Sequence, residues 1–149
     1  MEAINQPRVG IGVMIMKKGK VLLAKRKGSH GAGEYAFPGG HLEYNESFQE
    51  CAERETDEEC GVSITNIRFQ FLANITTYPP KCYTHVNLLA DWKAGLPIIK
   101  EPNKAESWDW YSLEDLPKPM FASCILAIDS YRTGQNYYDI PAVNDLLKG

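Results

Sequence analysis

The sequence lacks any long apolar run, and this absence excludes a membrane-spanning segment. Its first apolar stretch, from Val9 to Met16, is short and broken by glycines, and no basic segment precedes it. A helix that crosses a bilayer needs about 20 apolar residues, and a secretory signal needs an apolar core behind a basic start. We therefore expect a cytoplasmic protein that does not associate with a membrane.

Paired cysteines and an excess of positive charge are missing as well. The cysteines show no CxxC spacing and no metal-like arrangement, so we interpret them as reduced thiols: Cys51, Cys60, Cys82 and Cys124. The 16 Lys and Arg against 19 Asp and Glu leave a formal net charge of −3, which disfavours a nucleic-acid polymer as partner. A small phosphorylated ligand is not excluded, because it needs only a local site.

Several common catalytic motifs are also absent. The chain has no GxxxxGK[ST], no complete GxGxxG, no HExxH, no GxSxG and no EF-hand pattern. The chemistry of this protein must therefore be sought in another arrangement of side chains.

What is present is the pattern of one mixed α/β domain. A chain of 149 residues suits one domain with one core, so we treat 1–149 as a single domain. Alternation and turn residues predict strands at Val9–Met16, Val21–Arg26, Ser63–Tyr78, Tyr83–Trp92 and Ser107–Leu113, and helical periodicity predicts helices over Phe48–Cys60 and Phe121–Gly134. The tail after Gly134 is predicted to be irregular. Strands around two helices indicate a mixed α/β layer fold.

The first predicted helix carries too many acids on the wrong face. Ser47 and Glu50 form a capping-box pattern, and Gly61 supplies a stop. On a helical wheel, Phe48 and Ala52 mark the apolar side. Glu55 and Glu59 fall within that apolar stripe, and Glu58 lies at its edge. The opposite, solvent side is predicted to hold Glu50, Glu53, Arg54 and Asp57.

Crowding of these carboxylates is unfavourable without a partner. Like charges at helical spacings of three and four residues cost roughly 0.2–0.5 kcal/mol each on an exposed helix, and burial raises that cost. A solvated acidic face is the ordinary explanation of a glutamate run, but the wheel argues against it for Glu55 and Glu59. A divalent cation removes the conflict. Oxygen ligands without histidine or cysteine favour Mg²⁺ or Mn²⁺ and suggest phosphoanhydride chemistry.

At this point the spacing resembles the Nudix box, GX₅EX₇REUXEEXGU. Five residues separate Gly40 from Glu46, seven separate Glu46 from Arg54-Glu55, and the segment continues TDEECGV to Val62. Every fixed position matches, and the departure is Thr56, where an aliphatic residue is usual. The resemblance extends from Val9 to Phe121. Over this range the sequence is similar to the MutT-like branch of the family, which includes human and plant cytosolic nucleotide-cleaning pyrophosphatases.

The resemblance implies a fold, a reaction and a metal site. The fold is a Nudix α/β/α sandwich with a mixed sheet between helices, and the reaction is hydrolysis of a nucleoside diphosphate linked to another group. Carried onto this chain, the Mg²⁺ ligands (with Mn²⁺ as a substitute) are Glu55, Glu59, Glu58 and the Gly40 carbonyl. One of the three glutamates is expected to be the general base, and Glu46 and Arg54 form an orienting ion pair. The resemblance also suggests a homodimer.

Substrate-side candidates follow from the same resemblance and from side-chain chemistry. Arg26 is expected to face the phosphates, Gly39 to let the backbone approach an anion, and His41 to lie at the pocket. Aromatic rings that could stack a base are Phe37, Tyr83, Trp108, Trp110 and Phe121, while Asn87 could recognise a base edge and Glu106 could add a carboxylate. Each also has an ordinary explanation as a core or surface residue.

Taken together, the residues and the resemblance predict a Mg²⁺-dependent enzyme. We expect hydrolysis of a (deoxy)nucleoside triphosphate, oxidised or otherwise modified ones included, to the monophosphate and pyrophosphate. An alternative prediction is that the enzyme hydrolyses a phosphoanhydride in the same way but acts on a prenyl diphosphate, a nucleotide sugar or a dinucleotide. An alternative of another class is a non-catalytic nucleotide-binding module, against which the intact box speaks.

Overall fold

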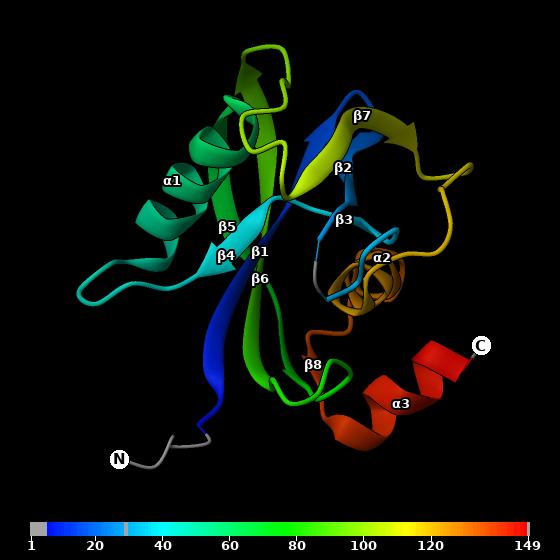
Figure 1. The fold of residues 1–149 in the computed structure, drawn as a ribbon. Coiled ribbons are helices and arrows are strands. Elements are labelled where there is room, and N and C mark those ends of the chain that lie inside the picture. Colours follow the sequence, from blue (N-terminus) through cyan, green and yellow to red (C-terminus); the bar gives the residue numbers. More distant parts are fainter. Residues whose placement is uncertain (1–5, 29, 149) are drawn as a thin grey trace.

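A single mixed sheet organises the chain. The computed structural model describes residues 6–28 and 30–148 (Figure 1). Its strands are β1 (Arg8–Lys17), β2 (Lys20–Arg26), β3 (Tyr35–Ala36), β4 (Gly39–His41), β5 (Ser63–Ile75), β6 (Tyr83–Ala94), β7 (Ala105–Ser112) and β8 (Tyr137–Tyr138). They form an 8-stranded sheet in the order β3-β2-β1-β6-β5-β8, with β4 paired to β1 and β7 paired to β2.

Strand β1 lies at the centre and is shared by two neighbours along one edge. Its far end, at Met16 and Lys17, pairs with β2, whereas its near end, at Gly10–Gly12, pairs antiparallel with β4. Its other edge runs parallel to β6 over its whole length. Because β2 and β4 leave β1 in different directions, the sheet divides along this edge (Figure 1).

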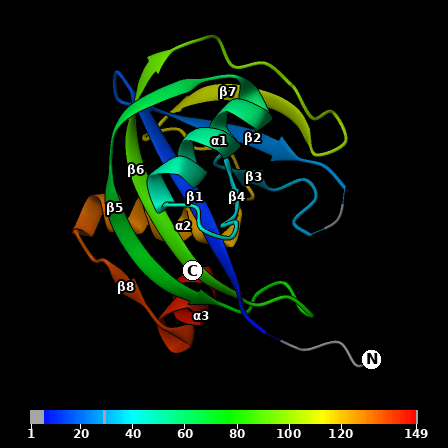
Figure 2. The same ribbon diagram turned by 90° about the vertical axis from the view of Figure 1, so that its left-hand side faces the viewer.

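Helices cover both faces of the sheet, which confirms the predicted α/β/α sandwich. Helix α1 (Phe48–Cys60) packs on one face, and α2 (Ala122–Thr133) and α3 (Ile140–Lys148) lie on the other (Figure 2). Alternating strand side chains supply the two apolar cores. Ile11, Val13 and Ile15 point towards α1, and Met14 points towards α2. Within the described residues, no helix is both long and apolar enough to cross a membrane.

The predicted elements are confirmed in type as far as Gly134, although the strand predicted over Ser63–Tyr78 ends at Ile75 and the strand predicted over Ser107–Leu113 runs over Ala105–Ser112. The prediction of an irregular tail is wrong. Tyr137 and Tyr138 pair in parallel with β5, and Tyr138 is fully buried. Helix α3 follows and buries Val143 against the same core. A helix of 9 residues is marginal on its own, so tertiary packing rather than local propensity forms it.

Candidate active site

Helix α1 begins and ends where the sequence predicts. The Ser47 side chain accepts a hydrogen bond from the Glu50 amide, and the Glu50 carboxylate accepts one from the Ser47 amide, which completes the capping box. Gly61 adopts φ 72° and ends the helix, with its N–H donating to the Asp57 carbonyl. The residues that α1 buries are Cys51, Ala52, Thr56 and Cys60.

The predicted apolar side of α1 is wrong in one residue. Phe48 is 48% exposed, and the two residues after it are exposed as well. The buried stripe instead starts at Cys51 and Ala52, one turn later. Glu55 lies at this stripe, as the wheel predicts, and its side chain is only 15% exposed.

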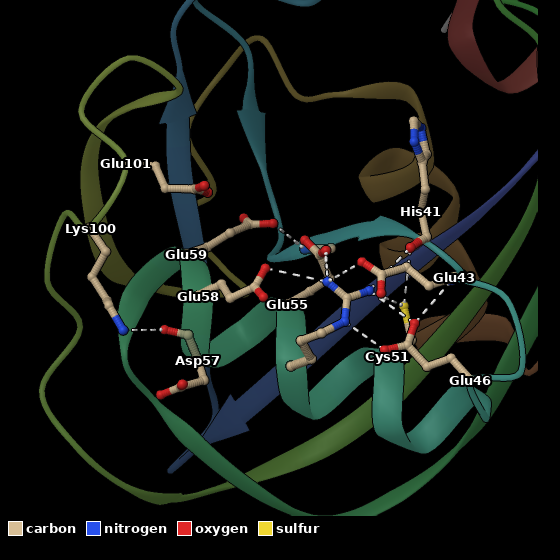
Figure 3. Close-up of polar contacts among 12 residues, drawn as sticks. His41, Glu43, Glu46, Cys51, Glu55, Asp57, Glu58, Glu59, Lys100 and Glu101 are labelled. Atoms are coloured by element: carbon tan, nitrogen blue, oxygen red, sulfur yellow. Dashed lines mark hydrogen bonds and ion pairs between the residues drawn. The ribbon is translucent and has the colours of Figure 1, made fainter.

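Arg54 does not take the solvent side that the wheel assigned to it. Its guanidinium folds back over the helix and is only 23% exposed. Nε and Nη2 bind the two Glu46 carboxylate oxygens at 2.5 and 2.9 Å, and Nη1 lies 2.6 Å from Glu55 Oε1 (Figure 3). Hydrogen bonds from Arg54 lower the pKa of Glu46 to about 2. The wheel failed here because a long arginine side chain reaches across the helix surface to buried acids.

Glu55 and Glu59 bring two carboxylates into contact. The Gly39 amide donates to Glu59 Oε1 at 3.3 Å. Burial, and then the neighbouring Glu55, hold the pKa of Glu59 well above its ordinary value. The Glu55 carboxylate also lies against Gly40 so closely that a Cβ at that position would collide with it. This backbone approach explains the glycine of the box.

The donor set of this cluster fits a hard divalent cation. Arg54 pairs with both Glu46 and Glu55, so one positive charge is shared between two carboxylates, and among the described residues no Lys, Arg or His forms an ion pair with Glu59. A buried carboxylate beside a second one, with only oxygen donors around both, is suited to Mg²⁺ or Mn²⁺. The residues that could hold the ion are the four predicted ones: Glu55, Glu59, Glu58 and Gly40.

Glu58 is the most exposed of the three box glutamates. Its side chain is 53% exposed and lies 3.3 Å from Arg54 Nη1. Glu101, which sequence reasoning missed, points towards Glu59 from the segment after β6 (Figure 3), and its charge helps to raise the pKa of Glu59. Lys100 anchors that segment, because its Nζ donates to the Asp57 carbonyl at 3.0 Å. No helical or strand pattern marks these residues in the sequence.

A cavity of about 740 Å³ opens beside the carboxylates. Glu55 and Glu59 line one end of it, next to Gly39 and Gly40. Its walls carry several cationic or titratable groups, namely Arg26, Lys27, His30, His41, Lys81 and Lys104. A space with carboxylates at one end and cations along its walls suits a ligand that carries both a metal ion and phosphate groups.

An aromatic stack forms another wall of the cavity. The rings of Tyr78 and Phe121 are parallel, with centroids 4.4 Å apart and planes 7° apart. The Arg26 guanidinium lies 4.4 Å above Phe121, and its Nε donates to the His30 carbonyl. Tyr78 is held in place because its hydroxyl donates to Glu34 and accepts from the Ala122 amide. Sequence reasoning missed Tyr78, because it placed this residue at the end of the predicted strand Ser63–Tyr78, whereas β5 ends at Ile75.

The remaining predicted substrate residues divide into two groups. Cavity-lining residues are Arg26, Phe37, Gly39, His41, Tyr83, Trp108 and Phe121. Three others do not reach the cavity wall. Asn87 is fully buried behind His85, Glu106 pairs with Lys25 at 3.6 Å, and Trp110 packs at the core beneath Lys17.

Comparison with known proteins agrees with this geometry. The NUDIX domain family profile matches residues 5–126. The NAD-capped RNA hydrolase NudC of Chromobacterium violaceum is 29% identical over 76% of this chain and 42% of its own length, and that of Vibrio vulnificus is 31% identical with the same coverage. The chain therefore spans less than half the length of these curated relatives. A MutT NUDIX hydrolase from Burkholderia pseudomallei has a crystal structure that superimposes with a TM-score of 0.79 and 31% identity, over 83% of this chain and 97% of that one.

The family profile covers most of the chain, and the superimposed NUDIX hydrolase from Burkholderia pseudomallei has the same fold. The box residues in turn meet in space as a carboxylate cluster backed by Arg54 and Glu46. The chain belongs to the Nudix family.

Proposed function

We propose that the protein is a Mg²⁺-dependent hydrolase of (deoxy)nucleoside triphosphates, which it converts to the monophosphate and pyrophosphate. The observation that carries the proposal is the single cavity with three kinds of wall: carboxylates, cations and an aromatic stack. These suit, in order, a metal ion, a phosphate chain and one nucleoside. Because Arg26 and Tyr78 cover the two faces of Phe121, a base would contact the edge of this stack or the outer face of Tyr78.

Metal binding is assigned to the carboxylate end of the cavity. Glu55 and Glu59 would hold the ion, with Glu58 and the Gly40 carbonyl beside them. When bound, Mg²⁺ neutralises phosphate charge and lowers the pKa of water. Arg54 fixes the Glu55 carboxylate through the 2.6 Å contact and is itself fixed by Glu46. Both are therefore positioning residues rather than catalytic ones.

Proton transfer falls to the box glutamates. Hydrolysis breaks one P–O bond of a phosphoanhydride, and the attacking water gives up a proton as its oxygen bonds to phosphorus. Glu58 is the candidate base that the geometry favours, because it is half exposed and shares only a 3.3 Å contact with Arg54. Lys81 and Lys104 line the cavity and are suited to bind the phosphates.

A second candidate substrate is a dinucleotide. The curated relatives NudC are named NAD-capped RNA hydrolases, and this chain aligns with less than half of their length. The phosphoanhydride chemistry is the same, and the difference lies in the group beyond the second phosphate. Prenyl diphosphates and nucleotide sugars remain alternatives of the same kind.

A substrate panel tests the proposal directly. Purified protein with Mg²⁺ is incubated with natural dNTPs, oxidised dNTPs, NAD, ADP-ribose, a prenyl diphosphate and a nucleotide sugar. We expect pyrophosphate and a nucleoside monophosphate from the triphosphates, and no turnover by the Glu59→Gln variant. Release of two monophosphates from NAD, with no turnover of any triphosphate, would instead establish the dinucleotide reaction.

The assembly is a separate proposal. We propose that residues 1–149 act as one Nudix domain and that two copies form a homodimer, on the strength of the family resemblance. Sedimentation equilibrium should then give twice the mass of the chain. Cytoplasmic localisation stays a prediction from the sequence.

A further inference from the structure

Three buried polar side chains form a line from helix α2 to the cavity. Gln70 Nε2 donates to the Ala127 carbonyl at 2.9 Å. Asn87 Nδ2 donates to Gln70 Oε1 at 2.7 Å, and His85 Nε2 lies 2.9 Å from Asn87 Oδ1. The three residues are 9%, 0% and 8% exposed. Such a buried network persists only when each group meets its complement.

The backbone carbonyl at one end fixes the direction of every hydrogen bond in the line. A carbonyl oxygen can only accept, so the Gln70 amide nitrogen must face Ala127 and its oxygen must face Asn87. The Asn87 nitrogen then faces Gln70, and its oxygen faces His85. That oxygen also only accepts, so His85 must donate from Nε2. Reversing any amide would set two donors or two acceptors against each other in a buried place.

The other ring nitrogen of His85 is left for a ligand. Nδ1 has no hydrogen-bond partner among the described residues, and His85 is 8% exposed. His85 lines the cavity together with Gly10 and Gly12. A Cβ at Gly12 would collide with Asn87 Oδ1 and with Cε1 and Nε2 of His85, and a Cβ at Gly10 would lie 3.4 Å from Nδ1. The lack of a side chain at Gly10 therefore leaves space beside Nδ1.

Stacking and burial also fix the orientation and the protonation state of the His85 ring. It stacks on Phe71 with centroids 5.7 Å apart and planes 30° apart. Burial lowers the pKa of His85 to about 4, so near neutral pH the imidazole carries one proton. With that proton on Nε2, the lone pair of Nδ1 faces outward.

We propose that His85 Nδ1 is a fixed hydrogen-bond acceptor in the cavity wall that selects nucleotides with a donor at that position. The donor is an N–H of the base or a hydroxyl of the sugar, which share this chemistry. Asn87 and Gln70 are positioning residues that act through His85. The selection of nucleotides rests on the proposed function, whereas the fixed tautomer does not.

The tautomer can be measured without any substrate. A long-range ¹⁵N–¹H NMR spectrum of the free protein separates protonated from unprotonated ring nitrogens. We expect a protonated Nε2 and an unprotonated Nδ1 for His85. Asn87→Leu should release this preference, and Asn74→Leu, at an exposed position of β5, should not. A proton on Nδ1 in the wild type, or an unchanged spectrum in Asn87→Leu, would overturn the fixed acceptor.

Selection is tested with nucleotides that differ by one donor. The pairs are ATP and purine riboside triphosphate, GTP and inosine triphosphate, and ATP with its 2′-deoxy and 3′-deoxy forms, so base and sugar donors are separated. We expect one deletion to lower kcat/KM about tenfold in the wild type, and the same deletion to have no effect in His85→Phe, which keeps the ring stacked on Phe71.

Two results would overturn selection by His85. One is a wild-type kcat/KM that stays the same when any of these donors is removed. The other is an equal loss of kcat/KM in wild type and in His85→Phe. Titration of backbone amide chemical shifts with each nucleotide, in wild type and in His85→Phe, gives the same comparison for binding alone, so a poorly active variant does not obscure it. If no nucleotide binds, the proposed function falls together with the selection, while the tautomer spectrum still decides whether the acceptor is fixed.

Discussion

At the scale of single residues, the carboxylate pair of Glu55 and Glu59 is unfavourable when both groups are ionised. The two side chains touch, and burial raises the pKa of Glu59. A carboxylate whose ionised form is destabilised binds a proton or a cation more readily. Removal of one charge should therefore affect stability and metal response in opposite directions.

The first prediction is that Glu59→Gln stabilises the metal-free protein and abolishes its response to Mg²⁺. Wild type should gain about 2.7 kcal/mol at a Mg²⁺ concentration of a hundred times Kd, seen as a rise of Tm in a thermal scan. The variant should start at a higher Tm, stay unchanged with Mg²⁺ and lose hydrolysis. Glu53→Gln, on the exposed face of α1, is the control that should behave as wild type. An equal Mg²⁺ shift in Glu59→Gln would show that the ion binds elsewhere.

Arg54 gives a second prediction, about positioning. Its guanidinium pairs with both Glu46 and Glu55. The ammonium group of lysine cannot form the two parallel hydrogen bonds that a guanidinium donates to one carboxylate. Arg54→Lys should lower Mg²⁺ affinity or kcat/KM about 10–100-fold, as changes around metal ligands do, with the fold kept by circular dichroism. Activity of Arg54→Lys equal to that of wild type would mean that Glu55 is oriented by other contacts.

The same residues show what sequence can and cannot reveal. Glu55 and Glu59 are predicted as inward-facing acids because helical periodicity places them relative to Phe48 and Ala52, which are close in sequence, although Phe48 itself proves to be exposed. Tyr78 and His85 were not predicted as parts of the site. Their roles depend on contacts with Phe121 and Gly12, which are far away along the chain and brought near only by the sheet.

At the scale of elements, α1 was predicted to the residue because its start and stop are local. Ser47, Glu50 and Gly61 satisfy terminal backbone groups without help from the rest of the chain. The short elements β8 and α3 were missed because they depend on pairing with β5 and on burial of Val143. Local rules therefore predict the helix that carries the box but not the tail that closes the opposite core.

A third prediction concerns the start of α1. Ser47→Ala removes the side-chain acceptor that satisfies the Glu50 amide, which should cost about 1 kcal/mol or roughly 2–4 °C of Tm. Urea unfolding followed by circular dichroism measures the change. Ser63→Ala, at an exposed position of β5, provides a matched control without a cap. Equal midpoints for the two variants would contradict a stabilising capping box.

At the scale of the whole molecule, a buried neutral histidine makes folding depend on pH. Burial lowers the pKa of His85 from 6.5 to about 4 in the folded state. Between these values the unfolded chain binds more protons than the folded one, so stability is complete above pH 6.5 and falls as the pH drops towards 4. The shift corresponds to roughly 3 kcal/mol at most.

The fourth prediction isolates this contribution. Free energies of unfolding from urea titrations at several pH values should decline more steeply in wild type than in His85→Phe across this window. Other titrating groups are common to both proteins and cancel in the difference. Parallel curves for the two proteins would show that His85 is protonated equally in the folded and unfolded chains.

One consequence of the shared strand β1 concerns which bond is cut. Residues Gly10–Gly12 pair with Gly39–His41 of β4 on one edge and with His85–Asn87 of β6 on the other. The glycines beside the carboxylates and His85, the proposed nucleotide contact, are thus attached to the same three residues. Under the proposed function, we expect this sheet to hold the metal site and the nucleoside at a fixed separation, so that the phosphoanhydride hydrolysed is set by its distance from the nucleoside.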